Sequence, residues 1–295
     1  MTKLLFTMLR RAGEASLTWL AYGLFRALPV DAASAFGGWL ASVVGPRLPV
    51  SRGAYRNLEL ALPERSAGEI DGLVRAMWAN LGRVTAEYAH LDKFRCYEPN
   101  GRVEVVGIEH LDAVRDSGTG ALFFSAHLGN WEILTLGATQ RGLALVQIYR
   151  AANNAAVDRL MARARRPVGG ALHPKGHRGA REATAALRRG EHVAMLVDQK
   201  LGEGIPVPFF GRPAMTAPAL ATLALRHHCP VLPTRVERLR GATFRLTVYP
   251  PMAIPDSGDR KADALALMVN VNAIVEEWVR ERPEQWLWLH SRWPK

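Results

Sequence analysis

The sequence predicts an α/β protein with a central mixed, mostly parallel sheet flanked by helices, preceded by an N-terminal membrane-associated helical segment. From residue 103 onward, short β-rich runs alternate with helical stretches, which is typical of a sheet covered by helices on both faces. Hydrophobic residues make up 48% of the 295 residues, enough for a full core. Two uncharged runs near the N-terminus stand apart from this alternation. We therefore expect N-terminal anchor or interfacial helices over residues 1–50 and the main domain over residues 51–295.

The uncharged N-terminal runs cover residues 15–25 and 32–46. Neither reaches the ~20 residues that a spanning helix needs. The favoured interpretation is an interfacial anchor or shallow hairpin on the membrane surface. Such an anchor would use aromatic rings at headgroup depth and arginines on anionic lipid: Trp19, Tyr22, Trp39, Arg10, Arg11 and Arg26. Two alternatives remain open: a signal peptide cleaved after residues 33–35, and an ordinary helical pair packed on the domain.

The remaining elements follow from local patterns. Ser66 and Glu69 form a capping-box signature, and apolar residues at helical spacing then predict one long amphipathic helix over 67–91. After Pro99-Asn100-Gly101, strands are predicted at 103–106, 121–125, 143–149, 192–197, 231–236 and 243–249. Helices are predicted at 109–116, 131–140, 154–165, 179–189 and 216–227, with a final helix over 261–281.

The chain is strongly basic, with a formal net charge of +11 and a pI near 10.2. This balance favours a negatively charged partner, which could be nucleic acid, anionic lipid or an acidic protein. Nucleic acid is the weakest of these, because the sequence has no aromatic RNA-binding signature, zinc-finger spacing or basic helix ahead of a heptad repeat. We therefore expect a membrane surface or acidic partner and no nucleic acid.

Cysteine and histidine usage limits the chemistry. Cys96 and Cys229 are too few for a disulfide framework, which fits a reducing compartment, and neither has the context of a nucleophile. His173 and His177 are four residues apart, but Pro174 between them argues against a helix. No ligand set with zinc spacing occurs. We expect no metal and no cofactor.

The most informative motif joins a strand to a helix. The apolar run 121–125 leads to His127, and Glu132 follows at the predicted start of a helix. Histidine suits general-base work near neutral pH, and a nearby carboxylate can fix its tautomer and stabilise the imidazolium. Asn130 is a good N-cap, and Gly129 would let the chain fold back so that the pair meets. The alternative is a purely structural histidine and glutamate.

Three polar residues follow successive predicted strands: His127, Arg150 and Asp198. Working residues gather at the carboxyl ends of strands in such sheets, so these three form a site hypothesis. A plain salt bridge between Arg150 and Asp198 is the alternative. The sequence has no Gly-x-Ser-x-Gly elbow, P-loop or dinucleotide fingerprint, and Ser125 lacks the sharp turn of a serine nucleophile. We therefore expect His127 to activate a substrate hydroxyl directly.

These residues resemble a known family. His127-Leu-Gly-Asn-Trp-Glu132 resembles the His-(four residues)-acid motif of glycerolipid-type acyltransferases. Nearly the whole chain is similar to the bacterial lipid A late acyltransferases, the lauroyl/myristoyl transferase family. The further matching segments are Ile148-Tyr149-Arg150, Asn153-Asn154, Asp158, Arg165-Arg166, residues 196–199, residues 207–211 and residues 283–290.

The resemblance implies a glycerolipid acyltransferase-like fold with its acyltransferase domain over residues 51–295. It implies an enzyme at the cytoplasmic face of the cell inner membrane. Such enzymes transfer a fatty acyl chain from acyl carrier protein to a hydroxyl on a primary acyl chain of a lipid A precursor, forming an acyloxyacyl group. The implied partners are acyl carrier protein, a phosphorylated glycolipid acceptor and the membrane surface.

The resemblance also assigns roles. The family's histidine and acid fall on His127, the general base, and Glu132, which would orient it; its arginine falls on Arg165 and its later aspartate on Asp198. The family often has proline where this chain has Ala151 and Ala155, in the loop that carries two further expected binding residues. The full set expected to bind substrate or the oxyanion is Arg165, Asp198, Arg150, Asn154, Gly129 and Asn130.

Several alternatives stay open. The acceptor could be another glycolipid, such as a phosphatidylinositol mannoside or an ornithine-type lipid, or the chain could be a non-catalytic basic protein that binds membranes or nucleic acid. The apolar, proline-rich segments 204–210 and 213–220 could line an acyl channel or simply pack on the core. The C-terminal tryptophans, Trp286, Trp288 and Trp293, could lie at the interface or be buried.

Overall fold

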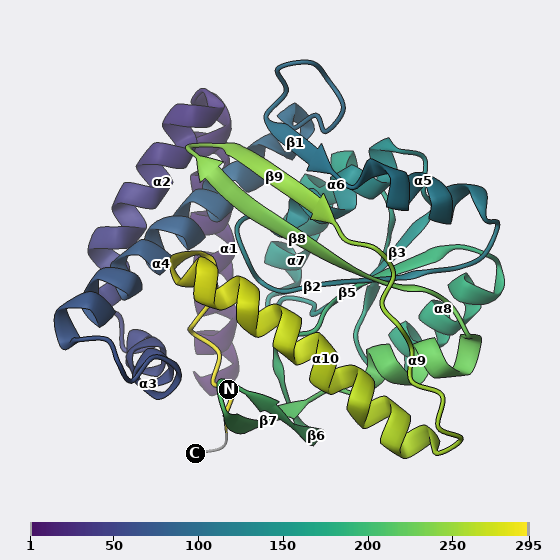
Figure 1. Cartoon of the computed structure of the whole chain (residues 1–295). Coiled ribbons are helices and arrows are strands. Elements are labelled where there is room, and N and C mark those ends of the chain that lie inside the picture. Colours follow the sequence, from purple (N-terminus) through teal and green to yellow (C-terminus); the bar gives the residue numbers. More distant parts are fainter. Residues whose placement is uncertain (1, 294–295) are drawn as a thin grey trace.

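The computed structural model describes residues 2–293, with a seven-stranded sheet at the centre (Figure 1). The strand order is β1-β9-β8-β2-β5-β3-β4, and all neighbours in it are parallel except β8 and β9. A mixed, mostly parallel sheet is thereby confirmed. The strands are β1 (Val103–Val106), β2 (Leu122–Ser125), β3 (Leu145–Tyr149), β4 (Ala171–Pro174), β5 (His192–Leu196), β8 (Val231–Arg240) and β9 (Thr243–Val248), with a separate hairpin of β6 (Lys200–Phe209) and β7 (Arg212–Thr216).

Helices cover both faces of the sheet, and Figure 1 shows α10 crossing in front of it. Leu122 and Phe124 of β2 pack with the cluster under α8, α9 and α10, whereas Phe123 packs with the cluster under α5 and α6. All four residues of β2 are buried, as expected for a central parallel strand. The helices from residue 67 onward are α4 (Ala67–Glu87), α5 (Ile108–Asp116), α6 (Glu132–Gln140), α7 (Ala155–Arg165), α8 (His177–Arg188), α9 (Ala219–His227) and α10 (Arg260–Glu281).

The N-terminal segment forms α1 (Thr2–Ala27) and α2 (Val30–Val44), followed by α3 (Ser51–Ala61). Helix α2 packs closely along α4, because a Cβ at Gly37 would lie 2.6 Å from the carbonyl oxygen of Gly82. Within the cleavage-like stretch 33–35, Ala33 and Ser34 are fully buried. Helix α2 is therefore packed on the domain, as the third interpretation of the N-terminal segment proposed. Among the described residues, no helix is both long and apolar enough to cross a bilayer.

The sequence located most elements within a few residues. The capping box is present, since the Ser66 backbone N–H donates to Glu69 Oε2 at 2.8 Å. The predicted long helix ends earlier than expected, at Glu87, and continues as a 3₁₀ turn over Tyr88–Lys93.

Four elements were not predicted: α3, β4, and the hairpin strands β6 and β7. Their local sequences work against their structures. Helix α3 contains Gly53 and Asn57, β4 ends in Pro174, and the hairpin carries three prolines. Edge and two-stranded positions tolerate proline because one side of each strand needs no ladder hydrogen bond. The apolar, proline-rich segments 204–210 and 213–220 therefore lie largely in β6 and β7.

The C-terminal tail packs under the hairpin and α10. Trp286, Trp288 and Trp293 are at most 3% exposed, so the buried alternative holds for all three. Arg292 is buried as well, and its guanidinium donates to the Met215 carbonyl at 3.1 Å and to Thr216 Oγ1 at 3.0 Å. This tail brings the Trp286 indole to the carboxyl edge of the sheet, beside the predicted site.

Candidate active site

His127 and Asp198 meet because β2 and β5 are neighbouring parallel strands. The register pairs Ser125 with Leu196, and each site residue comes two positions after this last pair. The carboxyl ends of both strands lie at the same edge, as the sequence predicted. Arg150 follows β3, which lies on the other side of β5.

Asp198 holds the histidine with both carboxylate oxygens. The His127 ring nitrogen Nδ1 lies 2.8 Å from Asp198 Oδ1, while the backbone N–H of His127 donates to Oδ2 at 2.9 Å. The indole N–H of Trp286 also donates to Oδ2, at 2.7 Å. Burial opposes ionisation of Asp198, but the His127 ring and these donors outweigh it and lower the pKa of the carboxyl well below its usual range. Asp198 is therefore a buried carboxylate that fixes His127.

The other ring nitrogen of His127 lies beside the side chain of Gln199. Its Nε2 lies 3.2 Å from the side-chain nitrogen of Gln199. With the proton on Nδ1 for Asp198, Nε2 accepts this bond and keeps the lone pair that a base needs. The ring lies edge-on to Trp131 at 5.1 Å and faces His290 at 6.3 Å between centroids. Burial, then the charge of His127, lowers the pKa of His290, which favours its neutral form.

Glu132 lies elsewhere, which corrects the predicted His127–Glu132 pair. Its carboxylate accepts two bonds from Arg165, at 2.6 Å to Nη2 and 2.8 Å to Nε, and one from the Tyr88 hydroxyl. Both members of the ion pair are buried, with 3% and 13% exposed side chains. Burial lowers the pKa of Arg165, but the bonds to Glu132 outweigh it and raise the pKa. Helix α6 begins at Glu132 and turns that side chain toward α7, away from His127.

Arg165, an expected oxyanion donor, is committed to this cluster. Its Nη2 also donates to the Tyr88 hydroxyl at 2.7 Å. Burial, then the Glu132 charge, raises the pKa of Tyr88 well above its usual value, so the phenol stays protonated. The hydrogen bonds among Glu132, Arg165 and Tyr88 thus join α6, α7 and the turn after α4, next to the loop over residues 126–131 that carries His127.

Gly129 and Asn130 shape the loop rather than point their polar groups at His127. Gly129 has φ of 55°, and a Cβ there would lie 2.6 Å from the Val236 carbonyl oxygen; its N–H donates to the Gln285 carbonyl at 3.2 Å. Asn130 is fully buried, and its Oδ1 accepts the backbone N–H of Glu132 at 3.2 Å. This bond supports the start of α6, although the N-cap position itself is Trp131.

A buried ion pair holds Asn130 in turn. The Asn130 amide donates to Glu87 Oε2 at 2.9 Å, and Arg238 donates to the same carboxylate at 2.5 and 3.0 Å. Glu87 also accepts the Ser34 hydroxyl at 2.7 Å. These contacts connect the loop over residues 126–131 to α2, α4 and β8.

The two remaining expected residues lie outside this cluster. Asn154 caps α7, accepting the Ala156 N–H at 3.1 Å, and its amide donates to the Arg11 carbonyl at 2.7 Å. Arg150 is exposed and has no ion pair within the described residues, so the salt bridge with Asp198 is absent there. Neither residue contacts His127 in this conformation.

Both cysteines are unsuited to nucleophilic work. Burial raises the pKa of Cys96 to about 12 and that of Cys229 to about 11. The thiolate is the nucleophile, so both thiols are inert near neutral pH.

The space beside His127 is narrow. The crevice that lies against it leaves no room for a water-sized sphere, unlike the roughly 300–1,000 Å³ of ordinary ligand pockets. A substrate must therefore widen it on binding. The lining residues are Met77, Asn80, Leu81, His127, Trp131, Gln285, Trp286 and Leu287.

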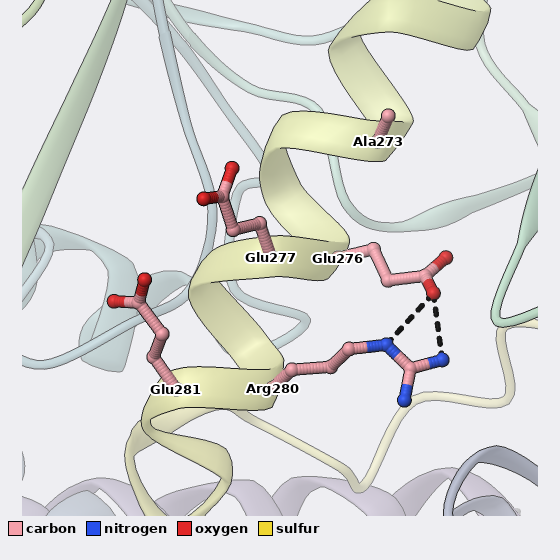
Figure 2. Close-up of a pocket in the computed structure, with 5 residues that line it drawn as sticks. All are labelled: Ala273, Glu276, Glu277, Arg280 and Glu281. Atoms are coloured by element: carbon pink, nitrogen blue, oxygen red, sulfur yellow. Dashed lines mark hydrogen bonds and ion pairs between the residues drawn. The ribbon is translucent and has the colours of Figure 1, made fainter.

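A larger depression of about 500 Å³ lies on the outer face of α10 (Figure 2). It is lined by Ala273 and four charged side chains, of which Glu276 accepts from Arg280 at 2.7 Å and Glu281 accepts from Arg235 at 2.5 Å. This depression shares no hydrogen bond, ion pair or ring contact with His127 or Asp198 in the described chain.

Sequence reasoning missed four residues of the site: Gln199, Trp286, Tyr88 and Glu87. Gln199 and Trp286 stand inside the quoted segments 196–199 and 283–290, but their contacts with the His127–Asp198 pair join residues 72 and 88 positions apart. No local pattern marks such contacts.

The pH dependence of stability should reveal the Asp198 carboxylate. Because its folded-state pKa is depressed, its ionised form stabilises the fold above the unfolded value near pH 4. That stabilisation declines as the pH falls below this value toward the folded pKa. We expect the free energy of unfolding, measured by urea titration between pH 6 and 3, to fall less steeply in Asp198→Asn than in the original chain. Equal slopes in the two proteins would contradict the depressed pKa.

Comparison with known proteins adds independent findings. The family described as "Bacterial lipid A biosynthesis acyltransferase" matches residues 2–295. A lipid A biosynthesis palmitoleoyltransferase of Escherichia coli K12 is 26% identical over 290 residues, covering 94% of this chain and 90% of that protein. A lipid A biosynthesis lauroyltransferase of the same organism is 29% identical, covering 81% and 77%. A phosphatidylinositol mannoside acyltransferase of Mycolicibacterium smegmatis is 24% identical, covering 81% and 78%.

Proposed function

The chain belongs to the bacterial lipid A biosynthesis acyltransferase family, and from that membership we propose which donor, acceptor and residues it uses. It is an acyltransferase of lipid A biosynthesis. The proposed reaction moves a fatty acyl chain from an acyl carrier protein thioester to a hydroxyl of a lipid A precursor. The observation that carries this proposal is His127 at the carboxyl edge of the sheet, with its Nδ1 held by the buried Asp198 carboxylate and its Nε2 beside the Gln199 amide.

His127 acts as the general base. Its Nε2 takes the proton from the acceptor hydroxyl, which displaces the Gln199 amide from that nitrogen. The hydroxyl oxygen attacks the thioester carbonyl carbon, and the carbon–sulfur bond of the tetrahedral intermediate then breaks. The departing thiolate takes the proton back from the imidazolium. The new ester forms without a covalent enzyme intermediate.

Two carboxylates divide the work that the sequence assigned to one. Asp198 orients the ring through Nδ1 and stabilises the imidazolium once the hydroxyl proton has moved. Glu132 acts at a distance, because its ion pair with Arg165 fixes the start of α6, directly after the loop that carries His127. Glu132 and Arg165 are thus positioning residues.

The developing oxyanion needs N–H donors, and one such donor is typically worth about 3–4 kcal/mol. The Gly129 N–H already donates to the Gln285 carbonyl, and Arg165 is bound to Glu132. The backbone N–H groups of Asn130 and Trp131 precede α6 and have no acceptor in the described part of the chain. We assign the oxyanion to these two groups, at the positive end of the helix dipole.

The experiment combines purified protein, an acyl carrier protein thioester and a lipid A precursor, and follows the acceptor by mass spectrometry. Gain of one acyl group per acceptor, dependent on both substrates, supports the proposal. Hydrolysis of the thioester with no acylated lipid would count against it.

A second acceptor has one specific support. Two phosphatidylinositol mannoside acyltransferases, from Mycolicibacterium smegmatis and Mycobacterium tuberculosis, are 24% and 27% identical to this chain. Both identities were measured over 242 residues, against 290 for the palmitoleoyltransferase. Offering both glycolipids in the same assay decides between them, and we expect the lipid A precursor to be acylated faster.

The proposed location is the cytoplasmic face of the cell inner membrane, held by an apolar face on α1 and α2. Exposed residues 17, 20 and 24 recur at helical spacing on α1, and residues 36, 40 and 43 do so on α2. The rings of Phe25 and Phe36 join the two helices at 6.4 Å. One expected lipid contact is already engaged, since Arg26 pairs with Asp92 at 2.6 Å. The exposed members of the apolar face on α1 and α2 are Leu17, Trp19, Leu20, Leu24, Phe36, Trp39, Leu40, Val43 and Val44.

Charge on this apolar face should weaken vesicle binding. Leu20 and Leu40 are 71% and 42% exposed, so replacing them by glutamate leaves the packed side of the helices intact. Each substitution should lower partition onto phosphatidylglycerol-containing vesicles about tenfold, because a buried leucine contributes roughly 1.5–3 kcal/mol. Flotation measures the bound fraction. Leu265→Glu on α10, where the leucine is also 42% exposed, is the matched control. Equal loss in all variants would contradict the assignment.

A further inference from the structure

Most of the net positive charge lies in one segment. Residues 150–190 contain ten lysines and arginines and two acidic residues, a net charge of +8 out of the +11 of the whole chain. This segment runs from the end of β3 through α7 and β4 to the end of α8. Because β4 is the last strand of the sheet, the part of this charge that follows β3 and β4 or lies on α8 is gathered at one edge of the molecule, whereas α7 packs against α1 and the turn after α4.

Eight of these ten cations are exposed and have no ion pair within residues 2–293. The two exceptions are Arg165, bound to Glu132, and Arg189, bound to Glu191. Solvated surface cations usually stand among anions, whereas here only Asp158 and Glu182 interrupt them, and Asp158 already accepts the Ala152 N–H. We call the five of these residues that follow β3 and β4 or lie on α8 the basic edge: Arg150, Lys175, Arg178, Arg181 and Arg188.

The basic edge carries no exposed large hydrophobic side chain. Between Val106 and Leu201 none is found, in contrast to the run of exposed apolar residues on α1 and α2. A surface that enters a bilayer needs apolar side chains beside its cations. Figure 1 shows α8 on the opposite side of the molecule from α2. This composition fits an acidic partner that approaches from the aqueous side.

The basic edge begins at the same edge of the sheet as His127. The backbone N–H of Lys175 donates to the Tyr149 carbonyl at 2.8 Å. Lys175 and Arg150 therefore follow the adjacent parallel strands β4 and β3, at the same carboxyl edge of the sheet as His127. From β2 to β4 the order crosses three strand spacings, about 14 Å at ~4.8 Å each. The first turns of α8 then present Arg178 and Arg181 beside that edge. A protein docked here could reach His127 with a flexible thioester arm.

We propose that the basic edge is the docking surface for the acidic carrier protein that delivers the acyl thioester. This rests on the proposed function. Complementary charge speeds encounter and sets orientation, and the effect falls as salt rises. The acceptor lipid, in contrast, approaches from the side of α1 and α2. Donor and acceptor thus reach His127 from different directions.

The test compares two donors that share one acyl chain, acyl carrier protein thioester and the N-acetylcysteamine thioester. The variant Arg178→Glu/Arg181→Glu changes exposed residues that contact neither His127 nor Asp198. We expect its kcat/KM with the carrier protein to fall at least about tenfold, through KM, with the short thioester unaffected. Arg240→Glu, an exposed arginine at the end of β8, is the control and should change neither value.

Binding of unacylated carrier protein, measured by fluorescence anisotropy, gives a second readout that needs no turnover. Weaker binding in the double variant, lost for both proteins in high salt, supports the proposal. Unchanged binding, or an equal loss with both thioesters, overturns it. Selective loss of vesicle binding in the double variant also overturns it, because the edge then serves the membrane. If the original chain transfers no acyl group, the proposed function fails, and the anisotropy result alone decides the docking surface.

Discussion

His127→Ala is expected to lower kcat by about 10³-fold or more, because it removes the group that we propose accepts the hydroxyl proton. The residual rate would come from binding and from oxyanion donors that the substitution leaves in place. Acylated lipid measured by mass spectrometry gives the rate. Because His127 is only partly buried, we expect the folded structure to persist, which circular dichroism would check.

His110→Ala is the matched control, since His110 lies on α5 away from the crevice and should leave kcat unchanged. Near-normal turnover of His127→Ala in a purified preparation would remove the basis of the mechanism. A large loss in both variants would indicate general damage instead.

Arg165→Ala is expected to have the largest effect on stability. It leaves the Glu132 carboxylate buried without its two guanidinium bonds, which typically costs about 3–5 kcal/mol. Arg165→Lys should recover only part of this, because an ammonium cannot make the paired bonds. The free energy of unfolding from urea titration is the measurement.

The double variant Glu132→Gln/Arg165→Met tests the reason for that loss. It removes both charges together, so we expect it to be more stable than Arg165→Ala alone. A double variant as unstable as the single one would show that the stability comes from packing of the Arg165 stem and not from its charge.

The sequence predicted the sheet better than the site. The alternation of strands and helices located β1, β2, β3, β5, β8 and β9, because each carries a local hydrophobic pattern. It also predicted that His127 follows the second strand of the sheet and Asp198 the fourth. It could not predict that β2 and β5 are neighbours, because strand order depends on which faces pack. The spacing of five residues therefore suggested Glu132 as the partner of His127, and the strand order made Asp198 the partner.

The roles of the expected binding residues depend in the same way on distant contacts. The Asn130 side-chain amide donates to the buried Glu87 and the Gly129 N–H donates to the Gln285 carbonyl, which leaves the backbone N–H of Asn130 for the proposed oxyanion. Both partners are far away in sequence. Local propensity could supply the helix start after Asn130, but not the buried carboxylate that binds it.

The most direct test of the central claim, that Asp198 acts through His127, is a double-mutant cycle. The kcat for acyl transfer is measured for His127→Ala, Asp198→Asn and the double variant, with Glu132→Gln as a further single variant. We expect Asp198→Asn to lose about 10²–10⁴-fold and to add almost nothing when His127 is already absent, because residues that act as a unit are not additive. Multiplying losses in the double variant, or full turnover in Asp198→Asn beside a large loss in Glu132→Gln, would contradict the account.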